Sequence, residues 1–274
     1  MSDAFENGSL HRGESEADLW AYLRRFTPAR IGLGRAGSSL PTQALLAFDL
    51  AHARARDAVH AAFDAETLAR GVHEAGFGEV PIVSSQARDR VEYLLRPDRG
   101  RSLSADSRDC LQKLPPQDRR IAIVIADGLS AVAPARHALP LLQEVRAGWG
   151  ERMRDSGPNV TVVVANHARV ALGDEIGGVL GAEAAIVLIG ERPGLSSPDS
   201  LGIYLTWAPR PGRTDAERNC ISNVRPEGLP YREAARRLVY LLCEARRLQR
   251  SGVALKDDSE SGGPAPPAFP HPDR

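Results

Sequence analysis

Long apolar runs and clustered cysteines are missing from this 274-residue sequence. No apolar run approaches the roughly 18 residues of a membrane-spanning helix, so a membrane protein of the usual helical kind is excluded. The 3 cysteines, Cys110, Cys220 and Cys243, lie far apart and include no CxxC pair. A zinc site or a disulfide framework is therefore not expected, and reduced thiols are the simplest interpretation.

An excess of charge of one sign is also missing, since 35 acidic residues balance 35 basic ones. This balance gives no broad electrostatic reason to bind nucleic acid or anionic membranes. Only Lys113 and Lys256 are lysines. Two explanations stay open for the abundant arginine: genome base composition, or an arginine-rich surface that pairs with carboxylates. A secretory signal begins with basic residues that are followed by an apolar stretch. The N-terminal residues of this sequence instead include scattered acids such as Asp3 and Glu6, so a cytoplasmic protein is expected.

Four segments are expected along the chain. Residues 1–18 are polar and aperiodic and are predicted to be disordered. Residues 19–114 are predicted to form a helical extension, because apolar side chains recur at spacings of three and four over residues 45–62. Residues 115–253 alternate between strand and helix patterns and are predicted to form an α/β domain. Residues 254–274 are rich in proline, glycine, serine and acids, which predicts a second disordered segment.

The α/β segment contains continuous apolar runs separated by helical patterns. Strands are predicted at residues 121–126, 160–165, 184–189 and 201–207, and helices at residues 134–149, 173–180 and 231–251. Apolar strands separated by helices indicate a parallel sheet that is covered on both faces. We therefore predict a Rossmann-like parallel-sheet domain with helices on both faces, preceded by the helical extension. The strand at residues 201–207 is placed at the edge of the sheet, since prolines close it.

One motif invites a nucleotide-binding interpretation. Residues 32–37 (GLGRAG) match the GxGxxG pattern, with Asp57 further along the chain. In a dinucleotide-binding fold, such glycines follow a buried strand and open a helix. Residues 27–31 do not have a strand pattern, and Asp57 falls inside the predicted helix. A loop before a helix, or an arm that reaches a partner, is the favoured interpretation, and a nucleotide-dependent oxidoreductase is the weaker alternative.

Polar loops gather at one edge of the predicted sheet. Ligands of open α/β sheets bind outside the carboxyl ends of the strands. Three such ends carry residues 127–130 (DGLS), 166–167 (NH) and 191–194 (ERPG), and we place the polar loop of residues 219–223 (NCISN) on the same edge. Turn formation alone explains any one of them, whereas four together favour a binding site. Ser130 is not part of a GxSxG motif, and no nucleophile has a base beside it, so no catalytic residue is predicted.

Several short stretches resemble the small subunit of ethanolamine ammonia-lyase, and they occur in the same order. They are residues 27–31 (TPARI), 34–37 (GRAG), 54–59 (RARDAV), 127–130 (DGLS), 190–195 (GERPGL) and 220–223 (CISN). The resemblance covers roughly residues 19–252 and leaves out both ends of the chain.

The resemblance implies a function as well as a fold. It implies adenosylcobalamin as cofactor and the deamination of ethanolamine to acetaldehyde and ammonia, by an enzyme that is free in the cytoplasm or enclosed in a bacterial microcompartment. The substrate site of this family lies in the large subunit, so this chain is expected to bind that subunit and to carry no catalytic residue. The family's corrin contacts carry over to Val170, Glu191 and Cys220.

No histidine lies in an Asp-x-His-x-x-Gly motif. The cofactor is therefore expected to keep its own base on cobalt, with no metal ligand from this chain. The alternative from another class is a free-standing α/β ligand-binding or scaffold protein with no role in a lyase.

Overall fold

The computed structural model describes residues 16–117, 120–152 and 159–259. The chain divides into two compact units, residues 1–54 and residues 55–274. Within the described ranges, no helix is long and apolar enough to cross a membrane.

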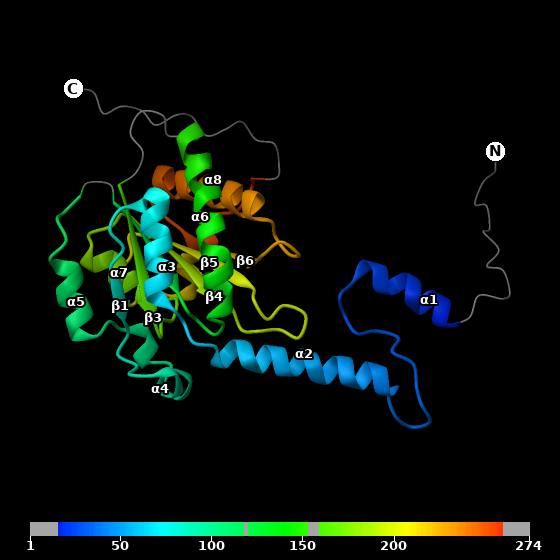
Figure 1. Ribbon diagram of the computed structural model, residues 1–274. Helices are drawn as coiled ribbons and strands as arrows, with labels where there is room; N and C mark the ends of the chain where they lie inside the picture. The colour runs from blue at the N-terminus through cyan, green and yellow to red at the C-terminus, as the bar shows by residue number, and fades with distance from the viewer. Residues whose placement is uncertain (1–15, 118–119, 153–158, 260–274) are drawn as a thin grey trace, which may run out of the picture. The chain divides into compact units, whose positions relative to one another are not determined.

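The first unit contains two helices joined by a glycine-containing loop (Figure 1). Helix α1 spans Glu16–Leu23, a 3₁₀ turn spans Arg24–Phe26, and α2 spans Thr42–His60 and continues into the second unit. Ala36 and Ser39 exchange two backbone hydrogen bonds, with N···O distances of 2.8 and 3.1 Å. The GxGxxG segment is thus a loop with a tight turn, and no strand precedes it among residues 16–41. The interpretation as a loop before a helix is confirmed.

The second unit is built on a six-stranded sheet with the order β1-β3-β2-β4-β5-β6. The strands are β1 (Ile82–Ser84), β2 (Ile121–Ala126), β3 (Val160–Asn166), β4 (Ala184–Gly190), β5 (Leu201–Trp207) and β6 (Arg218–Val224). β1, β2, β3 and β4 are parallel, which confirms the prediction for residues 121–126, 160–165 and 184–189. The prediction was wrong for β5, which is antiparallel to β4, and β6 is antiparallel to β5. A short connection can join antiparallel neighbours but cannot carry a crossover, which explains the reversal after β4.

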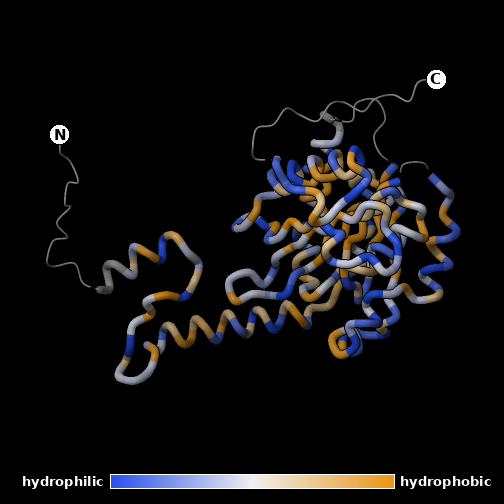
Figure 2. The backbone as a smooth tube through the Cα atoms, turned by 180° about the vertical axis from the view of Figure 1, so that it is seen from behind, coloured by the Kyte–Doolittle hydropathy of each residue, from blue (hydrophilic) through white to orange (hydrophobic). Residues whose placement is uncertain are grey.

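Helices cover both faces of this sheet, so the predicted α/β class is confirmed (Figure 1). The α-helices of the second unit are α3 (Ala65–Val72), α4 (Arg90–Leu95), α5 (Ala105–Gln112), α6 (Val132–Arg152), α7 (Leu172–Val179) and α8 (Tyr231–Leu248). Single turns of 3₁₀ or π-helix lie at His73–Phe77, Arg99–Arg101, Asp215–Glu217 and Gly252–Ala254. Helices α3, α6 and α8 pack on one face, and α5 and α7 pack on the other. Figure 2 shows that hydrophobic segments of the backbone gather in the interior of this unit.

Two features of the second unit differ from the sequence prediction. The strand β1 pairs with β3, and helices α3 and α5 pack on the cores of the sheet. The compact units therefore divide between Arg54 and Ala55, not at residue 114. The segment at residues 219–223, interpreted as a loop, lies within β6, and β6 forms the sheet edge that had been assigned to β5.

Both predicted disordered segments extend beyond the described part of the chain. Residues 1–15 and 260–274 lie outside it. Leu255 is buried against the core. The backbone carbonyl of Ser259 accepts a hydrogen bond from Nη1 of Arg236 at 2.6 Å. The chain is thus packed as far as Ser259, in contrast to the disorder predicted from residue 254.

Candidate functional site

The crevice between the carboxyl ends of β2 and β3 is filled by the chain itself. Asp127 follows β2 and is buried. Its Oδ1 accepts hydrogen bonds from the backbone N–H groups of Gly128 (3.0 Å) and Ala168 (2.9 Å). Its Oδ2 lies 3.3 Å from Nη1 of Arg90. Burial raises the pKa of Asp127, against the opposing effects of the Ala168 N–H and Arg90. This carboxylate therefore joins two strand ends and is not open to a ligand.

A buried tyrosine completes the filling of this crevice. Tyr93 is fully buried, and its hydroxyl donates to the carbonyl of Ala168 at 3.2 Å. The guanidinium carbons of Arg169 and Arg90 lie 4.2 and 4.9 Å from the centre of its ring, within the range of cation–π attraction. Burial raises the pKa of Tyr93, so the phenol remains a neutral donor. The loops at residues 127–130 and 166–167 therefore brace the sheet.

A hollow of about 480 Å³ opens beside this crevice, at the carboxyl ends of β1 and β3. It is lined by Ser84, Ser85, Gln86, Ala87, Arg88, Ser104, Ala105, Asn166 and His167. Several of these groups are already engaged within the chain. The hydroxyl of Ser85 donates to the carbonyl of His167 at 2.7 Å, and Arg88 pairs with Glu92 at 3.0 Å. Part of the polar lining of the hollow is therefore already committed within the chain.

The carboxylate of Glu191 lies where β4, β5 and β6 meet. Its backbone N–H donates to the carbonyl of Ser200 at 3.0 Å, and the Ser200 hydroxyl donates to Oε2. The backbone N–H of Asn223 also donates to Oε2, at 3.3 Å. A Cβ atom on Gly202 would lie 3.0 Å from Oε1, so glycine leaves room for this carboxylate. The structure thereby brings together the GERPGL and CISN segments.

Cys220 lies on β6 directly opposite Tyr204 of β5. The thiol is exposed, and its Sγ lies 3.3 Å from Oγ of Ser222. Tyr204 is half-buried, and its pKa is raised first by burial and then by the neighbouring Cys220 and Glu191. Its phenol is therefore neutral and can donate a hydrogen bond beside both side chains. Sequence reasoning missed Tyr204; the available signal was a polar-tipped aromatic inside the apolar run LGIYLTW.

Val170 lies in the loop that leads into α7. Its half-buried side chain packs on the same apolar cluster as Tyr204. Residues that pair directly across antiparallel strands project from the same face of a sheet, so Tyr204 and Cys220 share a face. Glu191 is two residues beyond Ile189, which belongs to that cluster. Val170, Glu191, Tyr204 and Cys220 thus lie on one side of the sheet, and we call these four residues the open face.

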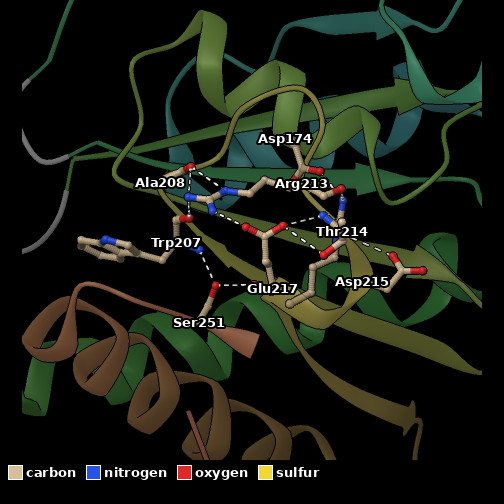
Figure 3. A network of polar contacts seen from close by, with 9 residues as sticks. Asp174, Trp207, Ala208, Arg213, Thr214, Asp215, Glu217 and Ser251 are labelled. Carbon is tan, nitrogen blue, oxygen red and sulfur yellow. Dashed lines mark hydrogen bonds and ion pairs between the residues drawn. The ribbon is translucent and has the colours of Figure 1, made fainter. Parts of the chain in front are cut away.

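The other end of β5 and β6 is held by a polar network (Figure 3). Arg213 donates from Nε to the carbonyl of Ala208 at 3.1 Å and forms an ion pair with Glu217. The backbone N–H of Thr214 donates to Glu217 at 2.7 Å. Together these contacts lower the pKa of Glu217 to about 2, with the Thr214 N–H as the largest cause. Ser251 donates to the carbonyl of Glu217 at 2.5 Å, so this network also fastens the segment that follows α8.

No metal site accompanies the open face. Across residues 16–117, 120–152 and 159–259, no three histidine, cysteine, aspartate or glutamate side chains gather closely enough to hold a metal ion. The open face instead combines a carboxylate, a phenol, a thiol and an apolar side chain. Such a set suits a ligand that has both amide groups and apolar edges.

Comparison with known proteins assigns the chain to a family. Residues 17–256 match the family model described as ethanolamine ammonia-lyase light chain (EutC). The chain is similar to the ethanolamine ammonia-lyase small subunit of Ralstonia nicotianae, with 54% identity over 88% of this chain and 89% of the relative. The small subunits of Azotobacter vinelandii and Pseudomonas putida are 53% and 51% identical, each over 91% of this chain and 92% of the relative. On these grounds the chain belongs to the light-chain (small-subunit) family of ethanolamine ammonia-lyase, a lyase.

Proposed function

We propose that this chain is the small subunit of an adenosylcobalamin-dependent ethanolamine ammonia-lyase, and that it holds the cofactor together with a large catalytic subunit. The observation that carries the proposal is the open face, where Val170, Glu191 and Cys220 lie on one side of the sheet with Tyr204. These three residues are the corrin contacts that the family resemblance implies.

The chemistry of the open face fits the rim of a corrin, which carries amide side chains. Oε2 of Glu191 accepts hydrogen bonds from Ser200 and Asn223, so Oε1 remains to accept one from an amide. The neutral phenol of Tyr204 can donate to an amide carbonyl, and Val170 offers an apolar contact. When bound, adenosylcobalamin supplies the radical chemistry that converts ethanolamine to acetaldehyde and ammonia. This chain binds and orients the cofactor and contributes no reacting group.

A large-subunit partner is part of the proposal. The relatives are named as small subunits. The first unit exposes large apolar side chains, including Tyr22, Phe26 and Leu46, of which Phe26 is 71% exposed. Exposed apolar groups of this size are typical of protein interfaces. We propose that residues 19–114 contact the large subunit, through these side chains among others, and that the enzyme works in the cytoplasm or inside a bacterial microcompartment.

The test measures cofactor affinity in the complex reconstituted with the large subunit. Cyanocobalamin is the probe, because it keeps the corrin amides and does not turn over. Glu191→Ala should raise its Kd roughly ten- to a hundredfold, since a hydrogen bond to a charged acceptor contributes about 1.5–3 kcal/mol. Arg192→Ala is the matched control, because Arg192 is the adjacent residue and its side chain is exposed. The control should leave Kd unchanged.

Two results would contradict the proposed function. One is an unchanged Kd for Glu191→Ala in a complex that assembles and melts like the wild type. The other is ammonia release from ethanolamine by this chain and adenosylcobalamin without a large subunit. The second result would favour an independent enzyme, and a failure to bind any large subunit would favour the free-standing scaffold protein.

A further inference from the structure

An ion pair that is almost wholly withdrawn from water joins α7 to β6. The side chains of Asp174 on α7 and Arg218 on β6 are each 2% exposed. Nη2 of Arg218 donates to Oδ2 of Asp174 and, at 3.1 Å, to the carbonyl of Arg213. The buried Nε of Arg218 has no hydrogen-bond partner within the described residues. The pair is therefore buried without full hydrogen bonding.

Stability alone does not explain such a pair. Removing two charges from water costs several kcal/mol per ion, and mutual attraction often fails to offset that loss. Burial raises the pKa of Asp174 to about 6, although Arg218 and Arg213 act in the opposite direction. The withdrawal from water thus outweighs the attraction at this carboxylate. A geometric role accounts for the pair better than an energetic one.

The pair connects the two elements that carry opposite sides of the open face. Asp174 is four residues beyond Val170, and the backbone N–H of Gly173 donates to the Val170 carbonyl at 3.0 Å, so helical turns link the two positions. Arg218 is two residues before Cys220 on β6, and alternate residues of a strand project from the same face. The position of α7 against β6 therefore sets the distance from Val170 to Cys220.

The neighbouring network of Arg213, Asp215 and Glu217 (Figure 3) keeps Arg218 in place. The carbonyl of Arg213 accepts from Arg218, and Arg213 is itself bound to Ala208 and Glu217. Nη1 of Arg218 lies 3.5 Å from Asp215, which is solvent-exposed. The guanidinium is thus held on the loop side by Arg213 and Asp215, while Asp174 is its partner on α7.

We propose that Asp174 and Arg218 are positioning residues that fix α7 against β6 and so set the spacing of Val170 and Cys220 for cofactor binding. This inference rests on the proposed function of the open face. Neither residue contacts the cofactor in this proposal. Their loss changes the shape of the open face without removing any of its side chains.

The test replaces both charges at once, by Asp174→Leu with Arg218→Met, in the complex with the large subunit. Apolar residues of similar volume avoid an unpaired buried charge, so the melting temperature should stay within a few degrees of the wild type. The KM for adenosylcobalamin should rise about tenfold, while kcat at saturating cofactor should stay within about twofold. A purely structural defect would lower kcat and the melting temperature together.

The matched control breaks a different ion pair of the same helix. Glu175, the next residue on α7, pairs with Arg108 of α5 and not with β6. Arg108→Met with Glu175→Gln removes both charges of that pair, as the test does, and should leave the KM for adenosylcobalamin unchanged. If the double variant does not assemble, Arg218→Lys replaces it, because lysine keeps the charge but lacks the planar fork that reaches two oxygens. Its KM should rise about threefold.

The outcomes separate this inference from the proposed function. A wild-type KM in the double variant, or in Arg218→Lys when the double variant does not assemble, overturns the positioning role. If Glu191→Ala still weakens cyanocobalamin binding in that case, the proposed function stands. If neither the double variant nor Glu191→Ala affects the cofactor, both are overturned.

Discussion

The contact between α7 and β4 depends on the missing side chain of Gly173. A Cβ atom there would lie closer than 3.0 Å to Cγ2 of Val187, in the middle of β4. Val187 is 1% exposed and its strand is flanked by β2 and β5, so neither its side chain nor its backbone can yield easily. Gly173→Ala is therefore expected to destabilise the fold.

Two opposing effects set the size of the destabilisation. Alanine is favoured over glycine inside a helix by about 1 kcal/mol. An extra methyl group in a well-packed core costs about 1–3 kcal/mol, and the upper end applies here because the χ1 angle of Val187 is restricted. The net loss should be about 2 kcal/mol. For a unit of this size, that loss lowers Tm by about 4–8 °C.

Thermal unfolding of the full chain, followed by circular dichroism, measures the loss. Gly148→Ala is the matched control, because Gly148 is also helical and its Cβ would lie 3.6 Å from Val239, an ordinary contact. The control should be as stable as the wild type or slightly more so. Combining Gly173→Ala with Val187→Ala should cost less than the sum of the two single changes. A Gly173→Ala protein that melts at or above the wild-type temperature would refute the reasoning.

Two further predictions concern a buried carboxylate and a backbone contact. Burial raises the pKa of Asp174 to about 6, so between pH 7 and pH 4 the native chain takes up a proton that the unfolded chain does not. As pH falls, the free energy of unfolding of the wild type should therefore increase relative to that of Asp174→Asn, by up to about 3 kcal/mol. Denaturant titrations at several pH values measure this difference, and a decrease of the wild-type value relative to Asp174→Asn would contradict the prediction. A Cβ atom on Gly190 would lie 2.6 Å from the backbone oxygen of Asp127 and closer still to that of Ser130, so Gly190→Ala should not yield a folded protein. Gly194→Ala is the control, because its Cβ would lie 3.8 Å from the nearest atom, the backbone oxygen of Ser197. It should express and melt like the wild type in the same assays. A folded, stable Gly190→Ala protein would disprove the close approach.

The central strands could be predicted from the sequence to within one residue. β2, β3 and β4 are largely buried on both faces, so each appears as a continuous apolar run. β6 could not be predicted in this way. It is an edge strand in which only Arg218, Ile221 and Val224 are buried, so it lacks an apolar run, and its sequence RNCISNV has the composition of a turn. β1 was predicted as a short strand, but its three residues could not indicate that it belongs to this sheet.

The residues of the candidate site were likewise predicted only in part from the sequence. The resemblance to a known family pointed to Val170, Glu191 and Cys220, and of these only Glu191 directly follows a strand end that the local motifs marked. Only the tertiary structure added Tyr204 beside them and Asp174 against Arg218, a residue 44 positions away. The sequence by itself determined which segments are apolar enough to form the core. The register of β4, β5 and β6 decided which side chains meet on the open face, because pairing between distant segments depends on backbone hydrogen bonds that no local pattern encodes.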